Sequence, residues 1–583
     1  MTAPVGRGAV VATAGHVDHG KSTLVRALTG IDPDRFAEEQ ERGLTIDLGF
    51  ASAPLPSGRL LSFVDVPGHV RFIANMLAGV GAVDACLFVV AATEGWKPQS
   101  EEHLRILELV GVTHGTVALT KVALVDDDRR TGAADELRAA VSGTFLADAP
   151  VVEVDAPSGS GVDELRDALD DMLAATPTAP DRGLSRLWVD RSFAARGSGT
   201  VVTGTLTGGA LRVGDDVVFE PGSRPARVRG LQRHHESAPA VGPGNRLAVN
   251  VAGVGHDEVR RGDALVRPDT WHLTRTLDAA LSVLPGLGHE VTRRGAYQAH
   301  IGSGRQAAQV RVLGAERVRA GETGLVRVHL SGAVPLLPGD RYVLRDSGRN
   351  ETVGGGEVLD VSPVLPAAKA RPDRSVERVV AERGWVDTAD LRRLTGEDRS
   401  PDVGRWVVAP AARAAAERDL RDRVTAAGPV GLATSELDDF GRALVGAMDG
   451  VEVVGGRARP AGARDELAEH WYVQALEAEP FSPPPAAEVD PAELRELVRR
   501  GLVVGGDGVW FSAGAVEQAA AVVSDLLAGR PEGVTVADVR DALGTTRKHA
   551  VPLLVLLDGR GVTRRRGDRR FPGPRAPRPD ATP

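Results

Sequence analysis

The chain has 583 residues, 42% of them hydrophobic and 26% charged, and its net charge is −9. A chain of this length exceeds what one hydrophobic core supports, so the sequence predicts several globular domains. It has no apolar run of the roughly 18 residues that a transmembrane helix needs, and its N-terminal residues lack the apolar core of a signal peptide. The lone cysteine, Cys86, excludes an internal disulfide, and we expect a cytoplasmic monomer that has no membrane partner.

Residues 1–178 alternate short apolar runs with amphipathic stretches of helical periodicity. The runs include "AVVATAG", "CLFVVAA" and "TVALTK", and "QSEEHLRILELVG" is typical of the stretches between them. This alternation predicts an α/β domain in which a parallel sheet is flanked by helices.

The segment "GHVDHGKS" (15–22) follows the first apolar run and precedes a helical pattern. Its spacing, G-x-x-x-x-G-K-[ST], is that of a phosphate-binding loop. Glycines let backbone N–H groups close around a β-phosphate, Lys21 can bridge the β- and γ-phosphates, and Ser22 offers a hydroxyl to Mg²⁺. The sequence therefore predicts a nucleotide site at the start of the first domain.

Two further segments carry groups that such a site needs. "DVPGH" (65–69) ends an apolar run, so Asp65 can reach Mg²⁺ through water and the Gly68 N–H can contact the γ-phosphate. Thr45, in "ERGLTIDLGF", can complete the metal shell only when the γ-phosphate is present, which predicts a switch loop. The candidate metal ligands are Ser22, Thr45 and Asp65.

Together, "GHVDHGKSTL", "RGLTI" and "DVPGH" resemble the translational GTPases related to elongation factor Tu. The resemblance implies GTP and Mg²⁺ as cofactors and a GTP hydrolysis that the ribosome stimulates. It implies that His69 positions the attacking water near Thr45, and that Val17 and Leu44 restrain His69 until the ribosome docks. It also implies contacts to the nucleotide from Gly15, His16, Val17, Asp18, His19, Gly20, Lys21, Ser22, Thr23, Asp65, Gly68, Thr120, Lys121, Asp155 and Ala156.

The base-reading loop departs from that family. The family pattern is Asn/Thr-Lys-x-Asp, whose carboxylate pairs with two guanine N–H groups, whereas this chain reads "TKVA" (120–123). "DAPSGSG" (155–161) resembles the last base-contacting loop, with Asp155 in place of serine. Because loss of a charged hydrogen bond costs about 1.5–3 kcal/mol, we expect one of the aspartates at 126–128 to substitute through a different loop path.

From residue 184 to about 365, alternating strands are separated by "GG", "VGD" and "GPG" turns, which predicts two small β-barrels over 182–270 and 271–366. "TIDLGF", "VDRSFAARGSGTVVTGT" and "GNRLAVNVAG" resemble the selenocysteine-specific elongation factors. This implies selenocysteyl-tRNA as a partner and an aminoacyl pocket at Asp190, Arg191 and Arg246. A selenol is largely ionised at neutral pH, so a cationic pocket favours it over a serine hydroxyl; arginines that face solvent or phosphate are the alternative.

The region 372–583 contains three similar segments, at 444–459, 497–511 and 553–571. Each reads as a helix end, a glycine turn, a strand, a polar turn and a second strand, which predicts α+β winged-helix repeats. Arginines gather in the last repeat, about 530–573, where the two earlier repeats carry paired glycines, and we expect this repeat to bind RNA. The residues expected to do so are Arg547, Lys548, Arg564, Arg565, Arg566, Arg569 and Arg570.

The fold class predicted from the sequence is multidomain: an α/β phosphate-loop GTPase domain, two β-barrels and C-terminal winged-helix repeats. The resemblance implies an elongation factor that delivers selenocysteyl-tRNA to the ribosome at UGA codons marked by an mRNA hairpin, which the last winged helix binds. A carrier for another specialised aminoacyl-tRNA and a nucleotide-gated regulator that reads duplex DNA are the alternatives. A third, a degenerate protein that does not hydrolyse GTP, is disfavoured by the intact Lys21, Asp65 and His69.

Overall fold

The computed structural model describes residues 8–33, 45–195, 197, 199–234, 236–462, 466–467, 469–506 and 508–576. The chain divides into two compact units, Met1–Ser400 and Pro401–Pro583, and each is described by itself. Within these described ranges no helix is long and apolar enough to span a membrane.

The first domain is built on a six-stranded sheet of order β2-β3-β1-β4-β5-β6. The neighbouring strands β3, β1, β4, β5 and β6 run parallel to one another. β4 is buried along its whole length, which explains its continuous apolar run. The edge strand β2 is antiparallel to β3, and the sequence analysis missed it because "GFASAP" contains no β-branched residue. The strands are β1 (Gly8–Ala14), β2 (Gly49–Pro54), β3 (Leu60–Asp65), β4 (Ala85–Ala91), β5 (Gly115–Thr120) and β6 (Val151–Val154).

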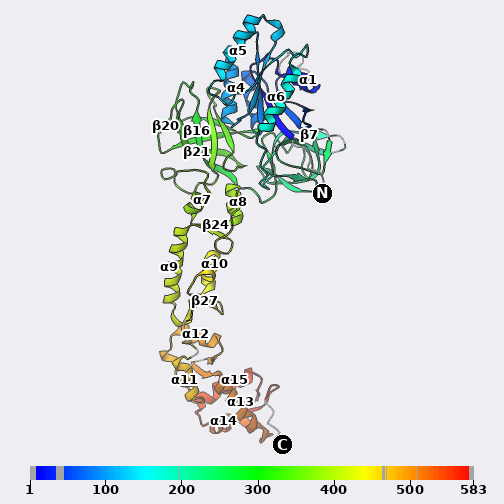
Figure 1. Cartoon of the computed structure of the whole chain (residues 1–583). Coiled ribbons are helices and arrows are strands. Elements are labelled where there is room, and N and C mark those ends of the chain that lie inside the picture. The colour runs from blue at the N-terminus through cyan, green and yellow to red at the C-terminus, as the bar shows by residue number, and fades with distance from the viewer. Residues whose placement is uncertain are drawn as a thin grey trace. The chain divides into compact units, whose positions relative to one another are not determined.

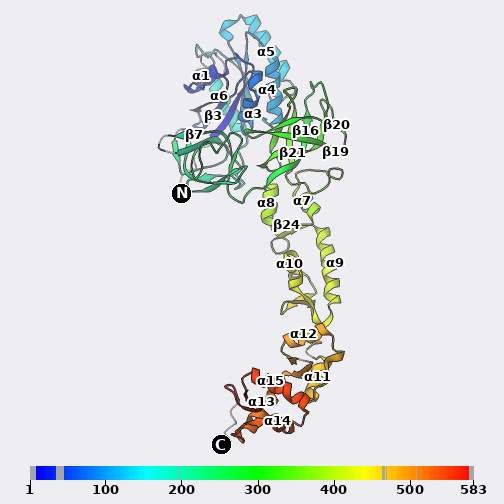
Figure 2. The ribbon, with the colours of Figure 1, turned by 180° about the vertical axis from the view of Figure 1, so that it is seen from behind.

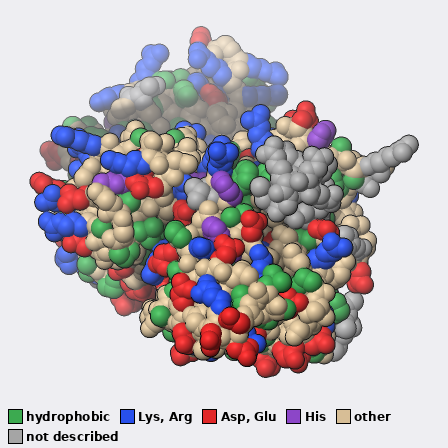
Figure 3. Space-filling model, turned by 90° about the horizontal axis from the view of Figure 1, so that it is seen from above, with side chains coloured by type: hydrophobic (Ala, Val, Ile, Leu, Met, Phe, Trp, Pro, Cys, Tyr) green, Lys and Arg blue, Asp and Glu red, His purple; other side chains and the backbone are tan. Residues whose placement is uncertain are grey.

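Helices cover both faces of this sheet (Figure 1). On one face, α1 (Lys21–Thr29) and α6 (Val162–Ala175) bury their leucines against the strands. On the other lie α3 (Ile73–Val80), α4 (Pro98–Leu109) and α5 (Asp127–Val141), all three of which are labelled in Figure 2. Short 3-10 turns, η1 (Val70–Phe72) and η2 (Val122–Leu124), follow β3 and β5. On the face drawn in Figure 3, acidic and basic side chains are interspersed.

The first barrel follows the order β10-β15-β7-β8-β14-β11, and β11 pairs back with β10 to close the ring. β12 extends the sheet from β11, and β9 pairs with β13 in a separate ribbon. The strands are β7 (Arg186–Ala195), β8 (Gly199–Thr207), β9 (Leu211–Arg212), β10 (Asp216–Glu220), β11 (Arg224–Arg233), β12 (Glu236–Ala238), β13 (Ala240–Val241), β14 (Asn245–Ala252) and β15 (Ala264–Val266).

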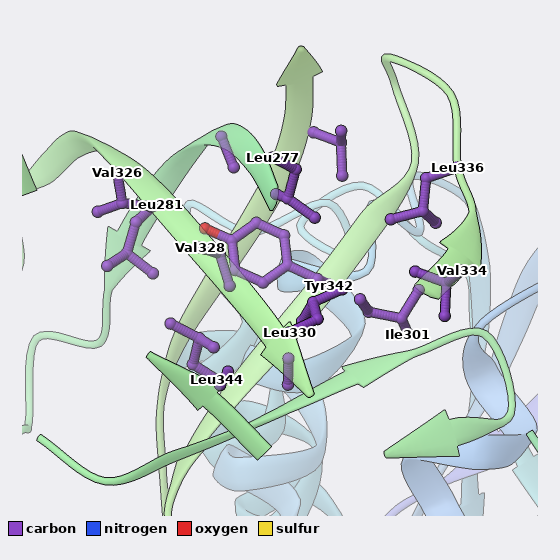
Figure 4. Packing of buried hydrophobic residues seen from close by; sticks show 14 of the residues in the cluster. Leu277, Leu281, Ile301, Val326, Val328, Leu330, Val334, Leu336, Tyr342 and Leu344 are labelled. Atoms are coloured by element: carbon purple, nitrogen blue, oxygen red, sulfur yellow. The ribbon is translucent and has the colours of Figure 1, made fainter. Parts of the chain in front are cut away.

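The second barrel is closed in the order β16-β21-β19-β18-β22-β23. Tyr342 fills its centre among Leu281, Val328 and Leu344 (Figure 4), and its hydroxyl donates to the Ala280 carbonyl at 2.8 Å, so the buried polar atom is satisfied. The strands are β16 (Leu273–Val283), β17 (Val291–Thr292), β18 (Tyr297–Ile301), β19 (Gly304–Leu313), β20 (Arg317–Val318), β21 (Thr323–Pro335), β22 (Arg341–Asp346) and β23 (Glu351–Asp360). α7 (Val376–Arg383), β24 (Trp385–Asp387) and α8 (Thr388–Thr395) end the first unit.

The second unit repeats a helix followed by a two-stranded wing, as the sequence predicts. After β25 (Trp406–Val408) and α9 (Pro410–Ala426), the first such set is α10 (Asp439–Ala447), β27 (Val451–Val454) and β28 (Arg457–Pro460), with β26 (Leu432–Ala433) beside β28. α11 (Trp471–Ala478) precedes the second set, α12 (Pro491–Arg499), β29 (Val503–Gly506) and β30 (Val509–Ser512). The third follows α13 (Ala513–Ala528), β31 (Val534–Thr535) and α14 (Val536–Ala542), and consists of α15 (Arg547–Gly559), β32 (Thr563–Arg566) and β33 (Arg569–Pro572). The predicted fold class is confirmed.

Candidate nucleotide and nucleic-acid sites

The predicted phosphate loop, residues 15–20, connects the end of β1 to the first turn of α1, where Lys21, Ser22 and Thr23 lie. Gly15 (φ +131) lies so near β4 that a Cβ atom would be 2.1 Å from the Val89 carbonyl oxygen. Gly20 (φ +86) and Asp18 (φ 62) also have left-handed backbones, which turn the chain sharply into the helix. The N-terminus of α1 therefore lies at the carboxyl ends of the parallel strands, where ligands of such sheets bind.

Lys21 and Gly68 meet in this loop. Lys21 is 6% exposed, and its Nζ donates to the carbonyls of Gly15 at 3.1 Å and His16 at 2.7 Å. A Cβ atom on Gly68 would lie 2.4 Å from Lys21 Nζ and 2.7 Å from the Val17 nitrogen. Only glycine allows the segment after β3 to approach the loop this closely.

The three candidate metal ligands converge. The Ser22 hydroxyl donates to Asp65 Oδ2 at 2.7 Å and lies 2.8 Å from Thr45 Oγ1. The other carboxylate oxygen, Oδ1, accepts from Thr13 Oγ1 at 2.6 Å, which fixes the orientation of Asp65. An all-oxygen set of two hydroxyls and one carboxylate has the chemistry that Mg²⁺ selects, so the residues present fit this ion.

The catalytic candidate His69 lies just after β3 and is half-buried. Its Nδ1 accepts from the Arg71 N–H at 3.2 Å, and its ring centroid is 5.9 Å from that of Phe72. Val17 is also half-buried, and its N–H donates to Gln99 Oε1 at 3.3 Å. Leu44, the other residue expected to restrain His69, lies outside the described residues.

Two buried histidines support the phosphate loop from behind, a role that the sequence analysis did not assign. His103, on α4, is fully buried, and its Nδ1 accepts from the Gly15 N–H at 3.1 Å. His19 is fully buried beside the Val89 carbonyl, with its Nδ1 3.3 Å from that oxygen. Burial lowers the pKa of each imidazole to about 3, so both rings are neutral at physiological pH.

At the base end of the site, two of the three aspartates that are expected to substitute for the missing carboxylate contact other groups. Thr120 Oγ1 donates to the His19 carbonyl at 2.7 Å, and Lys121 follows with a left-handed backbone (φ 57). Asp126 instead caps α5 by accepting from the Arg129 N–H at 2.8 Å, and Asp127 pairs with Arg130 at 2.8 Å. Both lie at the start of α5, which the chain enters shortly after Lys121, and the expectation for the aspartates at 126–128 stays a prediction. Asp155 follows β6 and is 8% exposed, with the half-buried Ala156 next to it.

The three predicted pocket residues lie together on the first barrel, and Phe50 of the first domain lies over them. Arg246 donates to both oxygens of Asp190, at 2.6 and 3.0 Å. Burial would raise the pKa of Asp190, but Arg246 and the Thr203 hydroxyl hold it below its usual range. The guanidinium carbons of Arg246 and Arg191 lie 3.4 and 4.6 Å from the Phe50 ring centroid. A cavity of about 370 Å³ is lined by Phe50, Arg191 and Arg246 together with Gln232 and His234.

The segment that ends in Phe50 is held from both sides. Its first residue, Thr45, contacts Ser22. Arg261 of the first barrel donates to both oxygens of Asp47, at 2.8 and 2.9 Å, and to Asn75 Oδ1 at 3.1 Å. Arg191 also donates to the Leu48 carbonyl. "TIDLGF" contains these contact residues, but the sequence alone does not show their partners.

The basic residues of the last winged helix fall into two groups. Arg547 and Lys548 are exposed in the first turn of α15, and Arg564, Arg565, Arg566 and Arg569 are exposed on the wing. Arg570, which we expected to bind RNA, is 4% exposed and pairs with Asp558 at 3.3 Å between Nε and Oδ2. It therefore does not belong to the exposed set, because alternate strand residues face opposite sides and Arg570 faces inward. Val551 and Val555, exposed one and two turns beyond Arg547, add an apolar strip that the sequence analysis missed.

Parts of the chain match four family models. They are the elongation factor Tu GTP binding domain over residues 7–175, elongation factor Tu domain 2 over 199–266, the β-barrel domain of selenocysteine-specific elongation factor over 286–364, and the winged helix of elongation factor SelB over 525–571.

Whole-chain comparisons agree with these models. The selenocysteine-specific elongation factors of Desulfomicrobium baculatum and Escherichia coli (strain K12) are 38% and 36% identical over 66% and 67% of this chain. The matches span 63% and 64% of those proteins, less than two thirds of their length. Elongation factor 1-alpha of Methanobrevibacter smithii is 30% identical over 60% of this chain and 97% of its own. A crystal structure of a bacterial selenocysteine-specific elongation factor superposes with a TM-score of 0.72 and 25% identity, covering 97% of this chain and 100% of that one. The chain therefore belongs to the translational GTPases related to elongation factor Tu and, within them, to the family of selenocysteine-specific elongation factors.

Proposed function

We propose that this protein binds and hydrolyses GTP and, in its GTP form, delivers selenocysteyl-tRNA to the ribosome at UGA codons that an mRNA hairpin marks. One observation carries the proposal: residues 45–50 connect the phosphate site with the arginine pocket. Thr45 contacts Ser22 at one end of this segment, and Phe50 packs on Arg246 at the other. The segment orders when the γ-phosphate is present and loosens after hydrolysis, so pocket and nucleotide are coupled.

In the phosphate site, Lys21 and the loop N–H groups bind the β- and γ-phosphates. Ser22, Thr45 and Asp65 would hold Mg²⁺, which when bound offsets negative charge on these phosphates. Gly68 brings its N–H to the same place, and His69, at the end of this segment, orients the attacking water. Hydrolysis is slow until the ribosome places His69, as in GTPases that are completed by a partner.

The pocket of Asp190, Arg191 and Arg246 selects the amino acid by charge. Arg246 pairs with Asp190, and Arg191 lines the same cavity, so two guanidinium groups face the pocket and favour a selenolate over a neutral hydroxyl. The test compares the affinity of the GTP form for the same tRNA charged with selenocysteine or with serine. We expect selenocysteine to bind about tenfold tighter or more, and Arg246→Gln to remove the preference, whereas Arg267→Gln on the same barrel keeps it. Equal affinities in the unaltered protein would contradict the selenocysteine assignment and favour another specialised tRNA.

The last winged helix binds the mRNA hairpin through its exposed cations. Arginine suits this target because its planar guanidinium stacks on splayed bases and forms paired bonds to phosphate. The test titrates the full chain with hairpins from downstream of in-frame UGA codons, with scrambled hairpins and with duplex DNA, across salt. A native hairpin should bind tightest, Arg547→Ala with Lys548→Ala should remove that margin, and Arg540→Ala on the neighbouring helix should not. Equal binding that depends only on salt, with a log–log slope of about −0.7 to −0.9 per phosphate contact, would reduce the tail to a basic tether. Preference for duplex DNA would support the regulator instead.

A further inference from the structure

We propose that Asp155 reads the guanine base and so replaces the carboxylate that is absent at Ala123. This inference rests on the proposed binding of GTP and names the residue that gives it base specificity. A chain that lacks the aspartate of one base-reading loop can then bind guanine through the carboxylate of the other loop.

The base end of the site lies where β5 and β6 terminate. The Thr120 hydroxyl ties the end of β5 to the phosphate loop through the His19 carbonyl, at 2.7 Å. β5 and β6 are parallel with Thr120 beside Val154, so Lys121 and Asp155 leave neighbouring strands at the same edge. Ligands of open parallel sheets bind at this edge, and a nucleotide whose phosphates lie on the loop extends its base toward it.

The fold fixes Asp155 at this position. Its N–H donates to the Ser160 carbonyl at 2.9 Å, and the Ser158 N–H donates to Asp155 Oδ2 at 3.3 Å. Gly161 (φ +75) closes the turn so near β6 that a Cβ atom would lie 2.0 Å from the Glu153 carbonyl oxygen. An ionised carboxylate has about four lone-pair sites, so the bond from Ser158 leaves acceptor capacity for a ligand.

The aspartates at 126–128 follow the same edge, at the start of α5, and are exposed. Ala123 is exposed within η2, so the position that carries the acid in related GTPases has no carboxylate. Asp126 caps α5 and Asp127 pairs with Arg130, while Asp128 is exposed on the first turn of that helix. Asp155 differs from these three in being nearly buried, and a carboxylate with little water around it forms the stronger hydrogen bond to a base.

The chemistry of the base selects a carboxylate. Guanine presents two adjacent donors, N1–H and an N2 amino hydrogen, which one carboxylate accepts together. Adenine presents a lone pair at N1 instead, which the same carboxylate repels. A serine at 155 would offer one hydroxyl and could not accept both bonds, so the aspartate at 155 compensates for the alanine at 123.

The test measures dissociation constants of the full chain for GDP, xanthosine diphosphate and ADP by calorimetry, in the unaltered protein and in Asp155→Asn. The amide keeps an oxygen for the Ser158 N–H, so the turn is preserved. Xanthine carries a carbonyl oxygen where guanine carries its amino group, and the new amide N–H can donate to that oxygen. We expect Asp155→Asn to weaken GDP by about 10- to 100-fold and to bind xanthosine diphosphate more tightly than the unaltered protein does, whereas Asp128→Asn changes neither.

A second variant tests compensation directly. In Asp155→Ser, GDP affinity should fall, and adding Ala123→Asp should restore most of it, because the acid returns to the position that related GTPases use. The assignment is overturned if Asp155→Asn leaves the ratio of GDP to xanthosine diphosphate affinity unchanged while the unaltered protein prefers GDP to ADP. If the unaltered protein does not distinguish GDP from ADP, the proposed GTP function itself fails, and the role of Asp155 fails with it.

Discussion

Gly68 lies at the closest approach between the segment after β3 and the phosphate loop, and a methyl group there has no free space. Because a Cβ atom would lie 2.4 Å from Lys21 Nζ, Gly68→Ala must displace the lysine or the loop. We expect the affinity for GTP to fall about tenfold or more. The affinity for GDP should fall less, because GDP lacks the γ-phosphate that Lys21 is expected to contact. Gly132→Ala is the matched control, since nothing lies within 4 Å of its added Cβ on α5. Equal GTP binding by the two variants would show that the close contact is absent in solution.

The neutral histidines behind the loop make stability depend on acid pH. His19 and His103 have folded pKa values of about 3, below the unfolded value of 6.5, so the unfolded chain binds more protons between these pH values. The free energy of unfolding therefore falls as pH drops from 6.5 toward 3, by up to about 1.4 kcal/mol per pH unit for each histidine. Burial of Asp84 raises its pKa to about 6 from 3.8, so this carboxyl acts in the opposite direction between those values and offsets part of the fall.

Urea unfolding of the unaltered protein and of His103→Asn at pH 7.5, 6 and 5 checks this expectation. The asparagine oxygen can still accept from the Gly15 N–H but does not titrate, so the variant should lose less stability between pH 7.5 and 5. The same loss in both proteins would mean that His103 is protonated in the folded state.

At the scale of single elements, the segment 45–50 is the connection between the two sites, and Arg261 is its main anchor on the barrel. Nη2 of Arg261 contacts both carboxylate oxygens of Asp47, and the two side chains are 30% and 22% exposed. Arg261→Ala should reduce the difference in tRNA affinity between the GTP and GDP forms about three- to tenfold, because the segment then moves without the barrel. Nucleotide affinity should stay within about twofold.

The control for this prediction is Arg267→Ala. Its pair with Asp215 has similar exposure, at 34% and 21%, but lies within the barrel. Fluorescent tRNA titrations in both nucleotide states give the two affinity ratios. If Arg261→Ala and Arg267→Ala change the ratio equally, the effect is one of barrel stability and not of coupling.

The same element shows what the sequence could and could not predict. The phosphate loop was predictable because Lys21 and Ser22 lie within one short contiguous motif, and the parallel strands because each is a continuous apolar run. The pair of Asp47 and Arg261 joins residues 214 positions apart, and no local pattern of charge or hydrophobicity reports such a contact. Arg570 was wrongly assigned because its neighbours in sequence are also arginine, so the residue types do not show which side chains face inward. The partner of Arg570 is Asp558, which is partly buried and lies on α15.

At the scale of the whole molecule, the chain keeps its two kinds of chemistry in separate compact units. The phosphate site and the arginine pocket lie within Met1–Ser400, and the basic winged helix lies within Pro401–Pro583. Each unit has hydrophobic clusters of its own. In the proposed function, the second unit therefore holds the factor beside the mRNA hairpin and takes no part in GTP hydrolysis.

A chain that ends at Ser400 separates these contributions. We expect it to bind GDP and GTP, and selenocysteyl-tRNA in the GTP form, within about twofold of the full chain, and to lose hairpin binding. If the hairpin acts as a tether, it raises the local concentration of the factor beside the UGA codon by a factor of about 10²–10⁴. In reconstituted translation, selenocysteine insertion by the truncated chain should then be lost at low concentration and recover in part as its concentration is raised. A loss that no concentration restores would mean that the second unit acts on the GTPase itself, because a tether supplies proximity and nothing more.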